Sequence, residues 1–336
     1  MRLFLGWVDV ASMKIVVFGA GSLGSLVGGV LAREHAVTLV GRAEHVGAIE
    51  STGLRVIAGF DAPADDPLGE AFPVTVHPDA TTDGRNLSAD LALVTVKAFD
   101  TKEAAADLAT GSFDTVCSLQ NGMGNEAVLG DALDAPVLAG TTTYGAIQRD
   151  PGVVECTGLG TVVLGPRDGG TSPEADRVGE AFRAADFDVT VADDMPRRLW
   201  EKLAVNAGIN AVTALARIRN GSVLEGPAND LARDAARETA RVARAHGADL
   251  TDREAVEAVE SVAEATAANT SSMQQDVLDD RRTEVDAING YVAGRAAALR
   301  EGRATTDADA YEITTPVNRT LAALLRAWER GRGLGA

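Results

Sequence analysis

Three polar side chains recur at a regular spacing in the otherwise apolar stretch WEKLAVNAGINAVTAL. Lys202, Asn206 and Asn210 stand at i, i+4 and i+8, and because a helix turns by 100° per residue they stay on one side of it over about 12 Å. Burying one ammonium and two amides is costly unless they meet a polar ligand or a hydrogen-bonding helix. Either interpretation predicts a helix that is buried and carries one polar face.

A second polar cluster contains Asn269, Thr270, Ser271 and Ser272. Ser272 and Gln275 are spaced as in a capping box, which predicts the start of a helix here. Four small polar side chains are more than a cap requires. The cluster is therefore also a candidate for ligand binding.

Glu284 follows in a segment that is expected to be helical. Val277 and Tyr291 stand seven residues before and after it, which predicts that the carboxylate lies on an apolar stripe. Two interpretations are open: an ion pair with Arg281 or Arg282, or a carboxylate that faces a pocket.

A glycine-rich motif lies between the apolar run KIVVF and a helical segment. It consists of Gly19, Ala20, Gly21, Ser22, Leu23 and Gly24. Glycines in this spacing allow a tight turn, close approach of the backbone to a pyrophosphate, and close packing of helix on sheet. The helix N-terminus then offers free N–H groups to the anion. The motif predicts a dinucleotide site, and a structural glycine turn is the alternative.

Further polar residues follow strand-like runs, namely Arg42 after VTLV, Lys97 after LALVTV, and Asn121 after SLQ. Ligands of doubly wound sheets lie across the carboxyl ends of the strands. NAD sites usually place an acidic residue where Arg42 stands, whereas an arginine suits the 2′-phosphate of NADP. We therefore expect NADP, although Glu44 is nearby and Arg42 is also explicable as a solvated loop residue.

The elements that must position these residues follow from the hydrophobic pattern. Short β-branched runs alternate with helical segments in the first half, which predicts a mainly parallel, doubly wound sheet. The expected strands are residues 14–18, 37–40, 54–58, 74–76, 91–96, 115–119, 137–139 and 187–191. Residues 153–155 and 161–164, separated by CTGLG, predict a hairpin.

The second half is helical in pattern almost to its end. The expected helices are residues 197–216, 228–246, 252–268, 273–301 and 316–331. We predict an N-terminal extension at 1–12, a dinucleotide-binding α/β Rossmann-type domain at 13–194 and an all-α domain at 195–336.

Composition excludes several classes of protein. The 336 residues carry 31 basic and 49 acidic side chains, a net charge of −18, which argues against nucleic-acid or anionic-membrane partners. No run is long and apolar enough to span a bilayer, and the first residues do not form a signal peptide, so we expect a cytoplasmic protein. Cys117 and Cys156 are expected to be buried thiols, and no metal site is expected.

Only four of the basic residues are lysines. A chain rich in acid and poor in lysine is typical of proteins kept soluble in high salt. Drift from lysine to arginine in a GC-rich genome explains the same count. Both interpretations stay open.

The motifs together resemble those of the ketopantoate reductases (2-dehydropantoate 2-reductases). The resemblance covers nearly the whole chain from Met13 and is carried, in family order, by MKIVVFGAGSLG, LVTVKAFD, QNGMGNE, GTTTYGA, LWEKLAVNAGINAVTAL, NTSSMQQD and RRTEVDAINGY. It implies a Rossmann domain followed by a helical domain like that of 6-phosphogluconate dehydrogenase. It also implies reduction of ketopantoate to pantoate with NADPH, on the route to pantothenate and coenzyme A.

By this resemblance Lys202 is the general acid, and Glu284 lies at the junction of substrate and nicotinamide ribose. The implied substrate contacts are Asn121, Lys202, Asn206, Asn210, Asn220, Asn269, Thr270, Ser271 and Ser272. The implied cofactor contacts are residues 19–24, Arg42, Lys97, Asn121, Gly145 and Glu284. Position 145 is Gly where the family leads us to expect Ala, and Thr270 replaces an apolar residue.

Two other functions are compatible with the same architecture. One is a reductase of another 2-oxo acid or of an imine, and the other is a non-catalytic NADP-sensing protein. The presence of both Lys202 and Glu284 favours catalysis. The expected partner is a small 2-oxo acid, with a homodimer as one candidate assembly. Since substrate and cofactor are anions, Arg42, Lys97 and Lys202 are expected around them, with the acidic charge on the outer surface.

Overall fold

The computed structural model describes residues 12–60, 66–302 and 313–334, so the predicted extension lies outside the described residues except for Ser12. The chain divides into two compact units. The first contains Met1–Gln120 and Asn125–Met195, and the second contains Asn121–Gly124 and Pro196–Ala336. The short segment Asn121–Gly124 therefore belongs with the helical half, although its neighbours in sequence belong to the α/β half.

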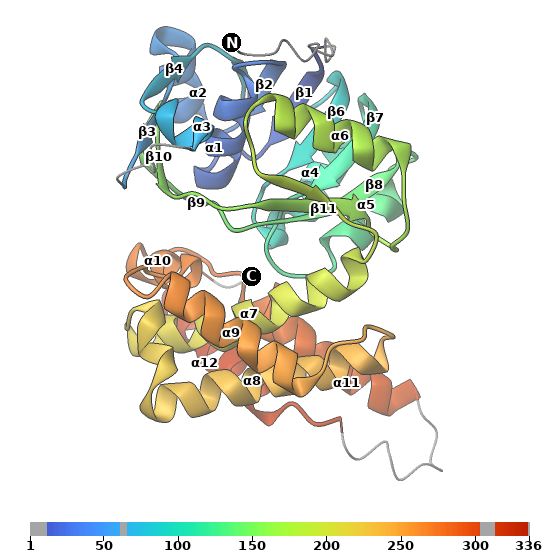
Figure 1. Ribbon diagram of the computed structural model, residues 1–336, viewed down its shortest axis with the longest axis vertical. Helices are drawn as coiled ribbons and strands as arrows, with labels where there is room; N and C mark the ends of the chain where they lie inside the picture. The colour runs from blue at the N-terminus through green and yellow to red at the C-terminus, as the bar shows by residue number, and fades with distance from the viewer. Residues whose placement is uncertain (1–11, 61–65, 303–312, 335–336) are drawn as a thin grey trace, which may run out of the picture. The chain divides into compact units, whose positions relative to one another are not determined.

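The first unit is built on a twisted sheet whose described strands follow the order β12-β11-β8-β7-β6-β1-β2-β5 (Figure 1). They are β1 (Lys14–Phe18), β2 (Ala36–Val40), β5 (Asp79–Thr81), β6 (Ser88–Val94), β7 (Ser112–Ser118), β8 (Val137–Thr142), β11 (Val162–Pro166) and β12 (Val189–Val191). Neighbours are parallel, except that β8 and β11 are antiparallel. The strand order reverses around β1, so the predicted doubly wound fold is confirmed.

Both faces of this sheet are covered, because successive side chains of each strand point to opposite sides. In β1, Ile15 and Val17 pack into a core shared with α1 (Ser22–Leu31) and α6 (Pro173–Ala184). Val16 and Phe18 pack into a second core with α4 (Thr101–Leu108) and α5 (Asn125–Ala132). The continuous apolar sequence of β1 follows from this burial on both sides.

A second, smaller sheet was not predicted. It has the order β4-β3-β10-β9 among the described strands, namely β3 (Leu54–Ala58), β4 (Val74–Val76), β9 (Gly145–Asp150) and β10 (Val153–Gly158). Helix α1 packs against it so closely that a Cβ on Gly29 would lie 2.9 Å from side-chain atoms of Leu54 and Val56. Short helices α2 (Ala43–Thr52) and α3 (Pro67–Glu70) and the 3₁₀ turn η1 (Ala98–Asp100) complete the unit.

The predicted hairpin at 153–155 and 161–164 is wrong. Strand β10 pairs with β9 and β3 in the small sheet, whereas β11 pairs with β8 and β12 in the main sheet. The tight turn instead precedes β10, where Gly152 adopts a φ of +75°. The glycines of CTGLG let the chain pass from one sheet to the other.

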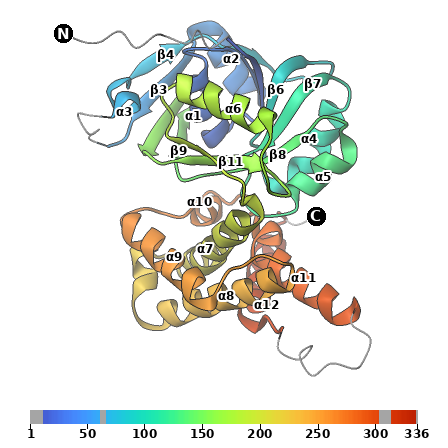
Figure 2. The same ribbon diagram turned by 45° about the vertical axis from the view of Figure 1, so that its right-hand side comes forward.

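The second unit is helical in its described part, with α8 and α9 side by side (Figure 2). Its elements are α7 (Met195–Ala216), η2 (Asn220–Leu224), α8 (Gly226–Ala245), α9 (Asp252–Ala265), α10 (Ser272–Leu278), η3 (Val285–Ala287), α11 (Asn289–Gly302) and α12 (Pro316–Gly331). Alanines dominate the core, so these helices approach closely. A Cβ on Gly208 of α7 would lie 3.0 Å from the carbonyl oxygen of Ala232 in α8.

The single helix predicted over residues 273–301 is wrong, because the chain leaves the helix after α10. Asp280 adopts a φ of +48°, the left-handed conformation that ends helices. The backbone N–H of Arg281 closes that end by donating to the carbonyl of Asp276 at 2.8 Å. The chain re-enters a helix only at η3 and α11, so Glu284 lies in a connecting segment.

Among the described residues there is no disulfide bond, membrane-spanning helix or candidate metal site. Cys117 and Cys156 are buried free thiols, as predicted, and burial raises the pKa of Cys117 to about 12. None of the described helices is both long and apolar enough to cross a bilayer. Over the same residues there is no cluster of three or more His, Cys, Asp or Glu side chains suited to a metal.

Candidate active site

The glycine motif forms the turn between β1 and α1, and its three glycines differ in their surroundings. Gly19 has a φ of +106° and donates its N–H to the carbonyl of Val40 at 3.0 Å. A Cβ on Gly24 would lie 2.2 Å from the carbonyl oxygen of Gly19, so Gly24 allows the helix to pack under the turn. A Cβ on Gly21 would meet only the Gly19 oxygen, at 4.0 Å, so the space beside Gly21 is open.

This turn fits the pyrophosphate of a dinucleotide. Gly21 is the N-cap of α1 and makes no side-chain cap hydrogen bond, so the first N–H groups of the helix are available to an anion. The Ser22 hydroxyl accepts from the backbone N–H of Gln148 at 3.0 Å, which ties the helix start to β9. Thr95 donates its hydroxyl to the carbonyl of Gly19 at 2.9 Å and holds the turn from the end of β6. Ala20 and Leu23 pack into the core behind it.

Arg42 lies directly beyond β2, next to this turn. It is exposed at the N-cap position of α2, and among the described residues its guanidinium forms no ion pair. Ala20 donates its backbone N–H to Val40 at 2.8 Å, and a Cβ on Gly41 would lie 2.9 Å from the Cβ of Ala20. The end of β2 and the glycine turn are thus bonded together, with Arg42 beside them.

Lys97 follows β6 at the same, carboxyl edge of the sheet, where it is half-buried and precedes η1. Gln120, at the end of β7, donates its side-chain amide to the Val96 carbonyl at 3.0 Å and to the Thr101 hydroxyl at 2.7 Å. Neither Gln120 nor Thr95 was predicted as a site residue, although Gln120 directly precedes Asn121 and Thr95 stands two residues before Lys97. Together they hold the strand ends that carry Lys97 and the glycine turn.

Gly145 lies at the start of β9 and shows why the chain departs from the expected alanine. A Cβ there would lie 2.4 Å from the hydroxyl oxygen of Thr157 in the neighbouring β10. The glycine is therefore explained by the packing of the small sheet. A contact to a ligand through the backbone is unaffected by this difference.

The polar row predicted for the helical unit is present on α7. Asn206 and Asn210 are each only 7% exposed, while Lys202 is half-buried. Among the described residues the Asn206 amide nitrogen has no hydrogen-bond partner, and the Lys202 ammonium has neither a hydrogen-bond nor an ion-pair partner. Burial lowers the pKa of Lys202 below its ordinary value. An ammonium and an amide donor are therefore available to an oxygen-rich ligand.

A loop from the end of α9 to α10 packs against the far end of α7. The hydroxyls of Thr213 and Ser271 hydrogen-bond at 2.7 Å, and Asn220 donates its side-chain amide to the Thr266 hydroxyl at 3.0 Å. The side-chain amide oxygen of Asn220 has no hydrogen-bond partner among the described residues. Thr213 and Thr266 were not predicted, because a threonine on a helix carries no signal of which face meets a loop.

The predicted capping box of Ser272 and Gln275 is wrong by one residue. Ser271 is the N-cap of α10, and its hydroxyl accepts from the backbone N–H of Gln274 at 3.2 Å. Ser272 is exposed as the first helical residue, and Asn269 is exposed as well. Of the polar cluster, Ser271 is thus the buried member.

Thr270, the other member of the cluster, is half-buried and accepts a hydrogen bond from Arg219 at 2.8 Å. Asn269 accepts through its backbone carbonyl from the N–H of Asn220 at 3.1 Å. The structure therefore brings Asn220 and the loop 269–271 together at the end of α7. It leaves Ser272 outside that group.

Glu284 and the segment Asn121–Gly124 belong to the same helical unit. Glu284 is 6% exposed and directly precedes η3. Met123 donates its backbone N–H to the carbonyl of Ala287 in η3 at 3.0 Å. Gly122, with a φ of +82°, packs on the same residue, since a Cβ there would lie 2.5 Å from the Cβ of Ala287. Asn121, which directly precedes Gly122 in the chain, is thereby held close to η3.

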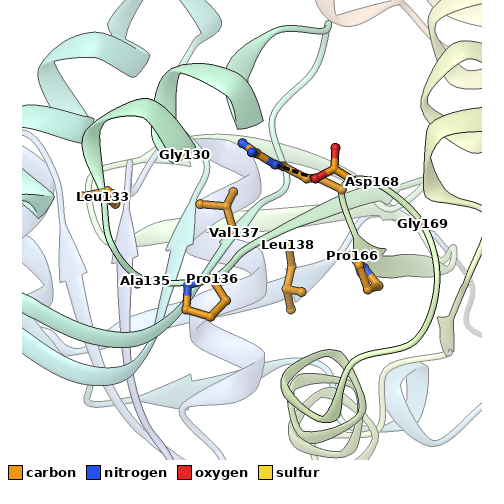
Figure 3. A pocket seen from close by; sticks show the side chains of 10 residues that line it. Gly130, Leu133, Ala135, Pro136, Val137, Leu138, Pro166, Asp168 and Gly169 are labelled. Atoms are coloured by element: carbon orange, nitrogen blue, oxygen red, sulfur yellow. Dashed lines mark hydrogen bonds and ion pairs between the residues drawn. The ribbon is translucent and has the colours of Figure 1, made fainter.

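A pocket of about 380 Å³ lies elsewhere on the first unit (Figure 3). It is lined by Gly130, Leu133, Ala135, Pro136, Val137, Leu138, Pro166, Arg167, Asp168 and Gly169. Val137 and Leu138 begin β8, so the pocket lies at the amino edge of the parallel strands, opposite the edge of the glycine turn. Arg167 is engaged by Asp168 at 3.3 Å and by the carbonyl of Glu126 at 3.0 Å. Because it lies at the opposite edge of the sheet, this pocket is distinct from the candidate active site.

Comparison with known proteins adds two family matches and close relatives. Residues 15–169 match the model for ketopantoate reductase PanE/ApbA, and residues 194–329 match the model for its C-terminal domain. The chain is 40% identical to a 2-dehydropantoate 2-reductase of Halobacterium salinarum, over 95% of this chain and 99% of that one. It is 38% identical to the corresponding protein of Archaeoglobus fulgidus, over 95% and 98% of the two chains.

A solved structure agrees with these matches. The crystal structure of a PanE/ApbA family ketopantoate reductase from Ralstonia eutropha JMP134 superimposes with a TM-score of 0.81 at 32% identity. The similarity covers 96% of this chain and 100% of that one.

Proposed function

The chain belongs to the ketopantoate reductase family, and from this premise we propose that it reduces 2-dehydropantoate (ketopantoate) to pantoate with NADPH, with Lys202 as the general acid. Relatives that span nearly the whole chain carry the name 2-dehydropantoate 2-reductase, which supports the substrate. When bound, the nicotinamide supplies a hydride to the keto carbon. The protein must then hold the substrate and deliver a proton to the keto oxygen.

The observation that carries the proposal is the polar row of α7. Hydride addition turns the ketone oxygen into an alkoxide, which needs a proton donor at hydrogen-bond distance. Lys202 offers an ammonium whose pKa burial lowers, which brings it closer to neutral pH and makes it a better acid. The unpartnered amide donor of Asn206 lies one turn further along the same face.

The remaining polar groups suit a small hydroxylated acid. The free side-chain amide oxygen of Asn220 can accept from a hydroxyl, and the free amide nitrogen of Asn206 can donate to a carboxylate, so both groups of the substrate find partners. We assign the Glu284 carboxylate to a hydroxyl of the substrate or of the nicotinamide ribose. In the first unit, residues 19–24 would hold the pyrophosphate and Arg42 the 2′-phosphate, with Lys97 and Gly145 as further cofactor contacts. Asn121, which belongs to the second unit, would be another cofactor contact.

The proposal is tested by following NADPH absorbance with ketopantoate, pyruvate and other 2-oxo acids, in parallel with NADH. We expect ketopantoate and NADPH to have the highest kcat/KM. Lys202→Ala should lose about 100-fold or more in kcat, the usual size of a general-acid contribution, while NADPH still binds. A higher kcat/KM with another 2-oxo acid would reassign the substrate. Binding of NADPH with no turnover of any acid would indicate a sensing protein.

A further inference from the structure

The segment that carries Glu284 is held by one face of the last helix, α12. Arg326 donates its Nε to Asp286 at 2.7 Å, and Arg332 pairs with Asp280. Between them, the Glu329 carboxylate accepts from both the backbone N–H and the hydroxyl of Thr283, at 2.8 and 2.6 Å. Residues three apart on the helix thus meet residues three apart on the segment, running in opposite directions.

The central contact differs from the two outer ones in its burial. Glu329 is 4% exposed and Thr283 is 3% exposed, whereas the outer ion pairs are open to solvent. Exposed ion pairs contribute little, because water and salt screen them. A buried carboxylate needs its hydrogen bonds, and a buried backbone N–H needs an acceptor. The contact between Glu329 and Thr283 is therefore the one that fixes the segment.

Thr283 passes this restraint on to Glu284, its neighbour in the chain. The Thr283 hydroxyl also accepts from the backbone N–H of Val285 at 3.3 Å. The Glu284 carbonyl accepts from the N–H of Ala287 at 3.1 Å. The backbone around Glu284 is thus bonded on both sides, on one side by Thr283, which the Glu329 carboxylate holds, and on the other by Ala287 of η3. A functional carboxylate must be held to within about 0.5 Å, and this arrangement can do so.

We propose that Glu329 is a positioning residue for Glu284. It touches neither substrate nor cofactor and acts through Thr283, so that Glu284 keeps one orientation. The inference rests on the role given to Glu284 under the proposed function. It assigns to the last helix a task in the reaction in addition to its packing.

Three single variants and one double variant test this proposal. Glu329→Leu removes the acceptor and should lower kcat/KM for ketopantoate by about tenfold to 100-fold, the range expected when a site loses its supporting hydrogen bond. Glu329→Gln keeps an amide oxygen that accepts both bonds, so its kcat/KM should stay within about threefold of the parent chain. Glu284→Ala measures the carboxylate itself, and the double variant with Glu329→Leu should be no worse than Glu284→Ala alone.

Glu238→Leu is the matched control for a purely structural effect. Glu238 is another buried carboxylate, 4% exposed, that accepts from the backbone N–H groups of Val317 and Asn318 at the start of the same helix. Glu238→Leu should lower the melting temperature as Glu329→Leu does. It should leave kcat/KM of the folded enzyme within about threefold, since the described hydrogen bonds of Glu238 go to Val317 and Asn318 and not to the Glu284 segment.

The outcomes separate the two hypotheses. If Glu284→Ala is as active as the parent chain, the proposed role of Glu284 is wrong. If Glu284→Ala is impaired and Glu329→Leu is not, the positioning role of Glu329 is wrong. Losses that multiply in the double variant would also overturn it, because they would show that Glu329 acts independently of Glu284.

Discussion

Lys202 combines a charge with a largely apolar helix, and that combination determines how it must respond to pH. Among the described residues no carboxylate pairs with its ammonium, and burial alone lowers its pKa. The charged form is therefore less stable in the fold than in water. A proton that is held less firmly is also transferred more readily.

The pH dependence of the reaction follows from this shift. Since the protonated lysine is the acid, kcat/KM for ketopantoate reduction should fall as pH rises through the pKa of Lys202, which lies below 10.5. Oxidation of pantoate needs the neutral amine and should rise over the same interval. Lys202→Arg should move the fall in reduction to higher pH, because a guanidinium stays charged. A reduction rate that stays constant up to pH 10.5 would contradict the assignment.

In the proposed site, Arg42 determines the choice between NADPH and NADH. Arg42→Ala should raise KM for NADPH by about tenfold to 100-fold, since a hydrogen bond to a charged group contributes about 1.5–3 kcal/mol. KM for NADH should change by less than about threefold, because NADH lacks the 2′-phosphate. Arg55→Ala removes another exposed arginine of the same unit and serves as the control. Equal effects on both cofactors would remove Arg42 from the phosphate site.

Some residues of the candidate site were predictable from their spacing in the sequence, and others were not. The spacing of Lys202, Asn206 and Asn210 predicted a shared face, because helical geometry is local and regular. The choice between Ser271 and Ser272 as the cap was missed, because adjacent serines offer the same side chain and only the path of the preceding loop decides. Glu329 carried no signal, since its partner Thr283 is 46 residues away in sequence.

At the scale of elements, the turn between β1 and α1 separates binding from folding. Gly21→Ala should keep the melting temperature within about 2 °C, since its Cβ enters open space, and should weaken NADPH binding at least about tenfold. Gly24→Ala should instead destabilise the first unit, because its Cβ would lie 2.2 Å from the Gly19 oxygen. Calorimetry and NADPH titration of both variants measure the two effects separately.

Gly47→Ala is the control for this pair. Gly47 lies in α2 with no atom within 4 Å of the added Cβ, so the substitution should be neutral or stabilise by up to about 1 kcal/mol. If Gly21→Ala bound NADPH like Gly47→Ala, the pyrophosphate would not lie against this turn.

Most elements were predictable because their patterns are local, and the errors occurred where pairing is non-local. The runs at 14–18 and 54–58 coincide with β1 and β3, yet nothing in the run of β3 indicates that it joins a second sheet. The hairpin was wrong for the same reason. The helix expected over 273–301 is interrupted at Asp280, which adopts a left-handed backbone conformation. The sequence gives no sign of this, because Asp280 is neither glycine nor proline and its neighbours are polar residues that a helix tolerates.

At the scale of the whole molecule, the charge of −18 affects stability more than fold. Exposed like charges interact over roughly one Debye length, which is about 10 Å at 0.1 M salt and about 3 Å at 1 M. Their repulsion is therefore strong in dilute salt and weak at 1 M. The ion pairs of the described residues join mostly exposed partners, so they offset little of this repulsion. The folded chain should therefore gain stability from salt.

We predict that the melting temperature rises with KCl between 0.1 and 2 M, by several degrees over the first molar, as the acidic surface is screened. A matched variant isolates the charge. Glu50→Gln, Asp131→Asn, Asp230→Asn and Glu264→Gln together neutralise four exposed carboxylates that form no ion pair among the described residues, which changes the net charge from −18 to −14. This variant should melt higher than the parent chain at 0.1 M KCl and at the same temperature at 2 M. If its advantage persisted at 2 M, or if KCl did not stabilise the parent chain, the excess of acid would be no adaptation to salt, and drift in composition would be the better explanation for the scarcity of lysine.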